Sequence, residues 1–396
     1  MKILIVTEAL VLGGAETFVL RLARRLRQDG HEAELLCLNP DLDDPRLVAQ
    51  FPDVPIHCVP ARGLRTVKRI DRVARMVGID LELQQQRAAR WVERHLIGRF
   101  DVHHTHLFGA DRLFARLKQK RPEMNIVATL HGDYALYEAR AAGTETSRIL
   151  HWRAKLGEVL ASVDRWVTIS PAQHRQFAET FGVDESKLTD IPNGYAPPAP
   201  IPLPEARDDD AVRFVMVARG MREKGWGHLI EAFGRLNGDV SLTLVGEGGF
   251  LDELRGRVSD PQVHFAGAHP NPVELIAAGD VFVHPSIYRA ESMPTVIIEA
   301  LFAGVPVIAT DVGSVAGMIA APSGELAGVL VEADETVLVD DLTAAMQAYV
   351  DDPALRERHA GLAAAAFAKF DMGKCAAAYA ALYAAVASKS LTKASH

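Results

Sequence analysis

Two apolar runs of the same kind decide the fold: Lys2-Ile-Leu-Ile-Val-Thr7 near the start of the chain and Arg213-Phe-Val-Met-Val-Ala218 in its second half. A loop that contains glycine follows each run, and a segment with apolar residues at helical spacing follows each loop. Short apolar strands that alternate with amphipathic helices are typical of parallel sheets covered on both faces. The sequence therefore predicts an α/β protein with two Rossmann-like domains.

A proline-rich segment marks the boundary between the two halves. Five prolines lie within residues 196–204, and this density excludes a helix or a central strand. We expect an N-terminal domain at 1–196, a semi-rigid linker at 197–210 and a C-terminal domain at 211–373. The alanine-rich residues 374–396 predict one amphipathic helix. Because ligands of open α/β sheets bind beyond the carboxyl ends of the strands, we expect the two domains to face each other across a cleft.

Length and composition restrict the class of protein. The chain has 396 residues, which corresponds to about two domains, and 48% of the residues are apolar and 24% charged. These values exclude a disordered chain, a fibre and a small disulfide scaffold. No uncharged apolar run reaches about 18 residues, and the three cysteines lack metal-site spacing. We expect a cytoplasmic protein in a reducing compartment.

The distribution of charge indicates which partners to expect. The net charge of −8 argues against a nucleic-acid partner. Residues 62–99 are nevertheless strongly basic, with ten cations against four carboxylates. The cations are Arg62, Arg65, Lys68, Arg69, Arg72, Arg75, Arg87, Arg90, Arg94 and Arg99. This segment is either a solvated helical surface or a platform that docks on anionic lipids at the inner face of the membrane.

Two glycine-bearing loops are candidate phosphate sites. The first, Leu12-Gly-Gly-Ala-Glu16, opens a helix but matches neither the dinucleotide fingerprint nor a Walker loop. It is a phosphate site or a plain tight turn. The second follows the strand at 213–218 and carries Arg219 and Lys224, which can neutralise the charge of a departing diphosphate. Its alternative is a solvated basic loop.

The stretch from residue 280 to residue 314 contains a pair of glutamates. Glu291 lies in a loop after a predicted strand, and Glu299 lies about one turn into a helix predicted to begin near Thr295. Carboxylates and the free N–H groups of a helix N-terminus can hold the hydroxyl groups of a sugar. Apolar residues flank Glu299, so its carboxylate requires a ligand or a basic neighbour.

Together these motifs resemble the retaining GT-B glycosyltransferases of family 4 (glycosyl transferases group 1), which include bacterial enzymes of lipopolysaccharide, capsule and mannoside synthesis. The resemblance covers nearly the whole chain in the right order. Its phrases are Gly13-Gly-Ala-Glu16, Leu130-His-Gly-Asp133, Ile191-Pro-Asn-Gly194, Arg219-x4-Lys224, Leu244-Val-Gly-Glu-Gly248 and Glu291-x7-Glu299. The GT-B fold implied has two Rossmann-like domains, with the C-terminal helix packed back on the N-terminal one.

The resemblance implies a role for each matching residue. Arg219 and Lys224 would hold the donor diphosphate, Glu299 would hold the ribose hydroxyls, and His131 would lie beside the donor sugar. Glu291 and the residues after it would hold the donor sugar; these residues are Ser292, Met293, Pro294 and Thr295. The catalytic residues implied are therefore His131, Arg219, Lys224 and Glu291.

Several glycines are also implied in donor binding. Gly13 and Gly14 would let the N-terminal loop approach the phosphate closely, because a Cβ would obstruct it. The base would lie near Gly246, Gly267 and Ala268 and would be bound mainly by backbone groups.

No metal or cofactor is expected, because enzymes of this family use cations and helix N-termini instead of an Asp-x-Asp metal site. The acidic runs at 41–44 and 208–210 are interpreted as solvated loops. His104 and His106 would share one face of a strand, which suggests zinc, but no third ligand is evident. We interpret them as lining the cleft or as purely structural.

The reaction implied is the transfer of a hexose-type sugar, with retention, from a UDP- or GDP-type nucleotide sugar to a hydroxyl acceptor. The acceptor expected is a bacterial surface glycan or a lipid-linked precursor. Two alternatives stay open. A GT-B partner subunit would only bind or scaffold, and a GT-B nucleotide-sugar epimerase would turn over the donor without an acceptor.

Overall fold

The computed structural model describes residues 1–61, 63–76, 79, 81–131, 155–201, 210–288 and 291–393. These residues form two compact units, Met1–Gly194 with Met372–His396, and Tyr195–Asp371. The division falls two residues before the predicted end of the first domain because the N–H of Tyr195 donates to the carbonyl of Phe370, at 2.7 Å. Tyr195 therefore pairs with the end of the second unit. Most of the proline-rich linker, residues 202–209, lies outside the described residues.

The first unit contains a seven-stranded parallel sheet in the order β3-β2-β1-β4-β5-β6-β7. Its strands are β1 (Lys2–Thr7), β2 (Glu32–Cys37), β3 (Ile56–Cys58), β4 (Val102–His106), β5 (Ile126–Leu130), β6 (Arg165–Thr168) and β7 (Leu188–Asp190). Its helices are α1 (Gly14–Gln28), α2 (Pro45–Val48), α3 (Leu64–Met76), α4 (Leu83–His95), α5 (Phe108–Lys120), α8 (Pro171–Glu179) and α16 (Met372–Lys393).

The second unit contains a six-stranded parallel sheet in the order β10-β9-β8-β11-β12-β13. Its strands are β8 (Val212–Val217), β9 (Val240–Val245), β10 (Val263–Gly267), β11 (Val281–His284), β12 (Val307–Thr310) and β13 (Gly328–Val331). Its helices are α9 (Trp226–Phe233), α10 (Gly249–Arg255), α11 (Val273–Ala277), α12 (Thr295–Phe302), α13 (Val315–Ile319), α14 (Leu338–Asp351) and α15 (Pro353–Phe367). The predicted α/β class with two Rossmann-like domains is confirmed.

The strand order of each sheet locates its ligand-binding edge. In the first unit the chain reverses direction across the sheet between β1 and β4, and in the second unit between β8 and β11. The loops that leave two such strands diverge, which opens a crevice at their carboxyl ends. Arg219 and Lys224 follow β8, and Glu291 and Glu299 follow β11, so the topology brings these residues to one edge.

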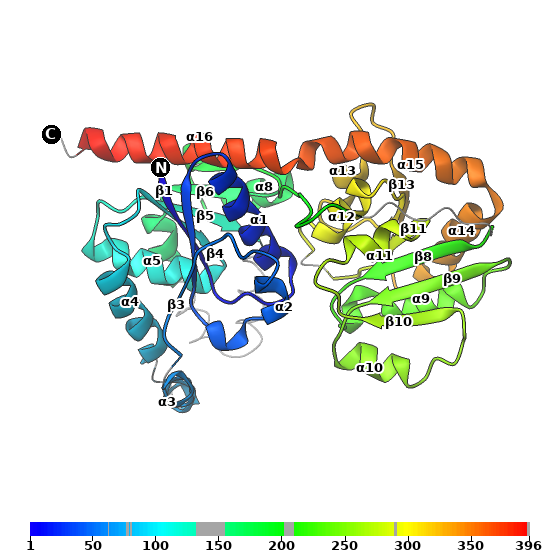
Figure 1. The fold of residues 1–396 in the computed structure, drawn as a ribbon, viewed down its shortest axis with the longest axis horizontal. Helices are drawn as coiled ribbons and strands as arrows, with labels where there is room; N and C mark the ends of the chain where they lie inside the picture. The colour runs from blue at the N-terminus through cyan, green and yellow to red at the C-terminus, as the bar shows by residue number, and fades with distance from the viewer. Residues whose placement is uncertain are drawn as a thin grey trace. The chain divides into compact units, whose positions relative to one another are not determined.

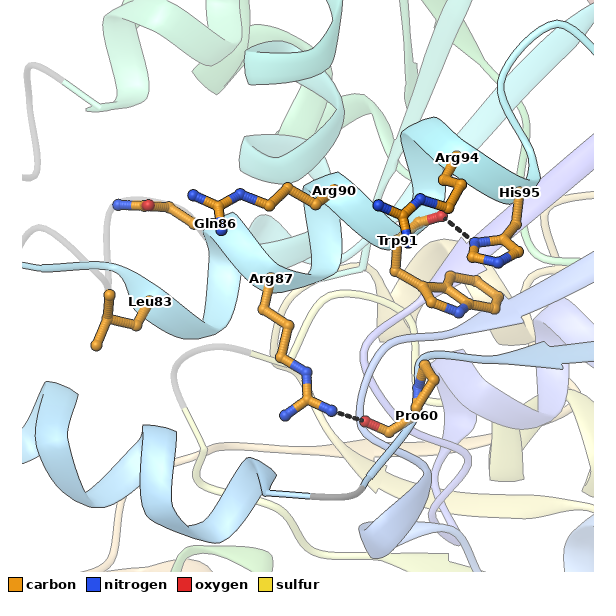
Figure 2. Close-up of a pocket in the computed structure, with 8 residues that line it drawn as sticks. All are labelled: Pro60, Leu83, Gln86, Arg87, Arg90, Trp91, Arg94 and His95. Carbon is orange, nitrogen blue, oxygen red and sulfur yellow. Dashed lines mark hydrogen bonds between the residues drawn. The ribbon is translucent and has the colours of Figure 1, made fainter.

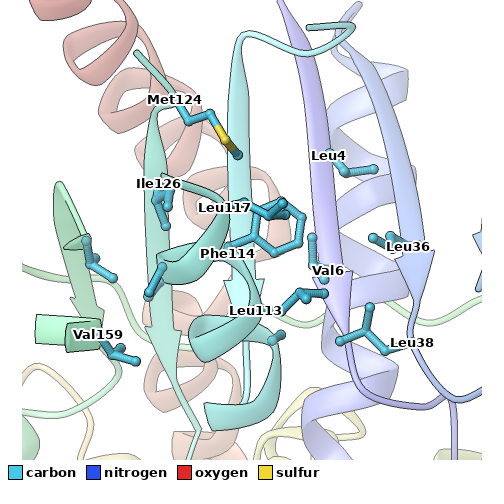
Figure 3. Packing of buried hydrophobic residues seen from close by; sticks show 14 of the residues in the cluster. Leu4, Val6, Leu36, Leu38, Leu113, Phe114, Leu117, Met124, Ile126 and Val159 are labelled. Atoms are coloured by element: carbon cyan, nitrogen blue, oxygen red, sulfur yellow. The ribbon is translucent and has the colours of Figure 1, made fainter. Parts of the chain in front are cut away.

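Opposite faces of the first sheet are covered by different helices. Leu4 and Val6 of β1 pack with Phe114 of α5 (Figure 3). Successive residues of a strand point to opposite faces, so Ile5 lies on the other face, beside its register partner His104 of β4. The C-terminal helix α16 packs against α1 and β4 within this unit (Figure 1). Among the described residues, no helix is long and apolar enough to cross a membrane.

Candidate functional site

The loops that follow β8 and β11 are joined by a buried ion pair. Lys224 ends a short 3-10 turn after β8, and its Nζ contacts Oε2 of Glu291 in the loop after β11. The side chains are only 8% and 10% exposed. Gly225 makes this approach possible because its φ is +81° and a Cβ there would overlap the carbonyl oxygen of Pro285. The structure therefore brings two of the predicted catalytic residues into contact.

Glu291 is held as a carboxylate by its neighbours. Ser286 Oγ donates to Oε2 at 2.9 Å, and His284 Nε2 lies 4.0 Å from Oε1. Burial alone would raise the pKa of Glu291, but the Lys224 ammonium and the hydrogen bonds from Lys224 and Ser286 lower it below its usual value. Burial lowers the pKa of His284 to about 4, so this imidazole is neutral at pH 7.

Ser286 and His284 have no role predicted from the sequence. Both lie in the stretch from residue 280 to residue 314, and His284 is the last residue of strand β11. Polar side chains at the carboxyl end of a predicted strand are the signal that identifies such neighbours. Among the described residues, neither ring nitrogen of His284 has a hydrogen-bond partner.

The segment after Glu291 forms the N-terminus of α12. Ser314 donates its backbone N–H to the carbonyl of Ser292 at 3.2 Å, and its hydroxyl donates to the same oxygen. Gly313, with φ of +59°, allows this contact because a Cβ there would overlap the carbonyl of Glu291. Helix α12 begins at Thr295, as predicted, and its first N–H groups have no partners within the helix.

Glu299 lies inside α12 and is 4% exposed. Its neighbours in sequence, Ile298 and Ala300, are fully buried. An ionisable side chain in such a place is costly unless it is paired, which is why the sequence singled it out. Whether Glu299 binds ribose stays a prediction.

Arg219 extends from the end of β8 as an exposed side chain. Its own carbonyl accepts the indole N–H of buried Trp226 at 2.9 Å. The side chain of Arg219 has no ion-pair partner within the part of the chain that the structure describes. This cation is therefore free to bind an anion.

Three loops meet backbone to backbone beside Arg219. The N–H of Gly220 donates to Glu247 at 2.8 Å, and the N–H of Gly246 donates to Gly267 at 2.9 Å. A Cβ at Gly246 would overlap the carbonyl oxygen of Ala218. Gly246 is therefore required by the packing of the β8 and β9 loops on each other. The proposed contact of a base with Gly246, Gly267 and Ala268 stays a prediction.

The N-terminal glycine loop precedes helix α1. Gly13 is the residue before the helix, and Gly14 is its first residue. The conformation of Gly13 is extended, with φ of −162°. A Cβ at Gly13 would meet only the end of the flexible Glu16 side chain, so the packing of this loop does not itself require a glycine. The phosphate role of Gly13 and Gly14 stays a prediction.

The first unit carries a cluster of neutral histidines at the ends of β4 and β5. His131 Nε2 and His106 Nδ1 share a hydrogen bond of 2.7 Å, and the two rings stack with centroids 5.0 Å apart. Phe18 of α1 lies against His131, at 5.4 Å between ring centroids. Burial lowers the pKa of His131 to about 3 and that of His106 well below its usual value. Gly132 and Asp133, which complete the predicted motif, lie outside the described residues.

His104 joins this cluster to the C-terminal helix. Its Nδ1 shares a hydrogen bond of 2.7 Å with the hydroxyl of Tyr383, and its Nε2 shares one of 2.7 Å with Oγ1 of Thr129. Thr129 in turn bonds to the hydroxyl of Tyr379 at 2.9 Å. Both ring nitrogens of His104 are thus engaged, and no group of three potential metal ligands occurs among the described residues.

The change Tyr383→Phe is expected to destabilise the first unit by about 1–3 kcal/mol, because it leaves Nδ1 of His104 buried without a partner. Tyr379→Phe is the matched control and should cost less, since Thr129 keeps its bond to His104. Urea denaturation followed by hydrogen exchange of the β4 and β5 amides measures both. Equal losses would show that the bond to His104 is not the cause.

Comparison with known proteins shows which proteins this chain resembles. A D-inositol 3-phosphate glycosyltransferase of Pseudarthrobacter chlorophenolicus is 26% identical over 87% of this chain and 83% of the relative. A phosphatidyl-myo-inositol mannosyltransferase of Mycolicibacterium smegmatis is 27% identical over 91% of this chain and 87% of the relative.

Solved structures and family models agree with these relatives. Anabaena HepE in complex with UDP and glucose superposes with a TM-score of 0.72 over 97% of this chain and 99% of HepE, at 18% identity. WaaG, a glycosyltransferase involved in lipopolysaccharide biosynthesis, superposes with a TM-score of 0.68 over 96% of this chain and 99% of WaaG, also at 18% identity. The models for Glycosyltransferase Family 4 and Glycosyl transferases group 1 match residues 12–197 and 202–363. This chain therefore belongs to the group 1 glycosyltransferases of GT-B fold.

Proposed function

We propose that this glycosyltransferase transfers a hexose from a nucleoside-diphosphate sugar to a hydroxyl acceptor, with retention and without a metal ion. The observation that carries the proposal is the buried contact between Lys224 and Glu291 at the strand reversal of the second sheet. A buried cation and a buried carboxylate at a ligand-binding edge supply opposite charges for the two halves of a donor. The diphosphate is anionic, and the sugar is rich in hydroxyl groups.

The chemistry follows from these charges. Cleavage of the sugar–phosphate bond gives the sugar oxocarbenium character and leaves negative charge on the diphosphate. Buried Lys224 and the exposed, free cation Arg219 stabilise that charge. Glu291 accepts hydrogen bonds from sugar hydroxyls, and the N–H groups at the start of α12 donate to them. Glu299 would bind the ribose, and the role of His131 beside the sugar stays a prediction.

Similar proteins support the class of donor and acceptor. HepE structures contain UDP and, in a second complex, UDP-glucose, which supports a UDP-type donor. The relatives named for D-inositol 3-phosphate and phosphatidyl-myo-inositol support a polyol or lipid-linked hydroxyl acceptor. We therefore propose an acceptor that is a cell-surface glycan or a lipid-linked precursor.

Helix α3 supports docking on a membrane surface. Exposed Ile70, Val73 and Met76 lie on the same helix as exposed Arg65, Arg69 and Arg72. Cations beside apolar side chains are the composition of a helix that lies in the interface of an anionic bilayer. Flotation with anionic vesicles tests this against the variant in which Arg65, Lys68, Arg69 and Arg72 are changed to Gln. Equal flotation of both proteins would contradict the docking.

A donor screen tests the transfer reaction. Calorimetry with UDP, GDP and ADP, followed by a hydrolysis screen across the matching sugars, is expected to give one preferred nucleotide and slow release of its diphosphate. The anomeric configuration of the product, read by NMR, tests retention, and unchanged rates after chelation test the absence of a metal. A folded protein that binds none of the nucleotides would be a scaffold, not a transferase.

A further inference from the structure

One face of helix α4 lines a pocket of about 340 Å3 (Figure 2). Residues three or four positions apart on a helix lie on the same side, and the pocket residues of α4 follow that spacing. They are Leu83, Gln86, Arg87, Arg90, Trp91, Arg94 and His95, and Pro60 lies opposite them. The volume is at the lower end of the range for ligand sites, which suits a group of headgroup size.

The described residues give the pocket a positive charge, and no carboxylate among them lines it. Arg87 donates one N–H to the carbonyl of Pro60 at 2.9 Å and has further donors to offer (Figure 2). Within the described part of the chain, Arg90 and Arg94 have no ion-pair partner. The nearby carboxylate of Glu82 is occupied by three cations of other helices, Arg112, Arg116 and Lys155.

An aromatic pair at the C-terminal end of α4 also lines the pocket. The rings of Trp91 and His95 stack with centroids 4.9 Å apart, and His95 Nδ1 shares a hydrogen bond of 2.8 Å with the carbonyl of Trp91 (Figure 2). Half-buried Trp91 offers an apolar ring with a polar edge, which is the side chain preferred at the lipid–water boundary.

The segment directly before α4 exposes several large apolar side chains. The described residues include eight exposed large apolar side chains, and five of them lie between residues 70 and 81, directly before α4. They are Ile70, Val73, Met76, Ile79 and Leu81. Asp71 of α3 accepts the N–H groups of Leu83 and Gln84, at 2.9 Å each, and so holds α3 against the start of α4. An arginine pocket beside an apolar, cationic helix matches an anionic lipid surface in both charge and polarity.

We propose that the α4 pocket binds the phosphate of an anionic membrane lipid and prefers a phosphomonoester headgroup. Guanidinium groups bind phosphate oxygens bidentately, and a monoester carries more charge and more acceptor oxygens than a diester. Trp91 and Leu83 then contact the glycerol region. The proposal rests on the membrane docking of α3 proposed above and adds headgroup selection. Helix α3 alone does not supply it, because exposed cations and apolar side chains do not distinguish one anionic headgroup from another.

The experiment compares two anionic vesicles at equal zeta potential, one containing phosphatidic acid and one containing phosphatidylglycerol. The wild-type protein is expected to bind the phosphatidic acid vesicles about tenfold more tightly, since charge-assisted hydrogen bonds contribute this order of energy. The variant R90Q/R94Q should bind both vesicles equally. K120Q/R121Q, which removes two exposed charges at the end of α5, should keep the preference.

The outcomes separate this proposal from the docking of α3. R65Q/R69Q is expected to weaken binding to both vesicles while the preference for phosphatidic acid remains. A wild-type ratio near one, or a ratio that R90Q/R94Q leaves unchanged in a normally melting protein, overturns the phosphate pocket. If the wild-type protein binds neither kind of vesicle, the membrane docking itself is contradicted. Calorimetry with UDP tests the proposed transferase function separately.

Discussion

Sugar transfer is expected to fall about 10²–10³-fold when Lys224 is replaced by methionine, because the departing diphosphate loses a buried cation. Arg222→Met is the matched control. Arg222 lies in the same short turn but is exposed, so its loss should change the rate little. Initial rates with the preferred nucleotide sugar measure the effect. Similar rates for the Lys224 variant and the wild type would contradict the assignment of the donor site.

The same change is expected to destabilise the second unit. Glu291 would stay buried beside a neutral His284, with only Ser286 donating to it, and its pKa would rise. Removal of one partner of a buried ion pair costs about 3–5 kcal/mol. The double variant K224M/E291Q removes the unpaired charge and should recover much of the stability but none of the activity. Recovery of both would show that the pair is purely structural.

Trp226→Ala is expected to lower the free energy of unfolding of the second unit by about 3–5 kcal/mol. The side chain is fully buried, and its indole N–H holds the carbonyl of Arg219 at 2.9 Å. The Trp226 ring also packs beside Gly246 of the neighbouring loop. Truncation therefore leaves a cavity and releases both loops beside the proposed diphosphate site, so nucleotide binding should weaken as well.

Trp226→Phe separates these two effects. Phenylalanine keeps most of the apolar volume but removes the hydrogen bond to Arg219, so it should cost less stability than alanine and still weaken nucleotide binding. Hydrogen exchange of the β8 and β9 amides reports on the second unit, and calorimetry reports on the nucleotide. If nucleotide binding falls only in proportion to the loss of stability in the two variants, the hydrogen bond from Trp226 to Arg219 does not contribute to binding.

Much of the local structure was predictable because it depends on short-range patterns. The apolar run at the start of the chain is strand β1, Lys2–Thr7, and the helix predicted near Thr295 is α12. A short run of apolar residues that is followed by a glycine turn and an amphipathic helix is typical of a strand covered on both faces. Motif residues such as Arg219 and Glu291 also lie after the carboxyl ends of strands, where open α/β sheets bind ligands.

Contacts between distant residues were not predictable in the same way. Lys224 and Glu291 are 67 residues apart, and they meet because β8 and β11 are neighbours in the sheet. Tyr383 and His104 are 279 residues apart, and they meet because the last helix packs on the first unit. Sequence periodicity determines which face of an element is apolar, but it does not determine which element covers that face.

The amino-acid sequence by itself determined the α/β class, the charged residues at the strand ends and the family to which the chain belongs. Only the tertiary structure decided that Glu291 is held by Ser286, that Gly246 serves loop packing and that Arg90 and Arg94 line a pocket together. The reason is physical. Local patterns follow from backbone geometry and burial, whereas partners across the fold follow from strand order and from the side chains that meet when the sheets are covered.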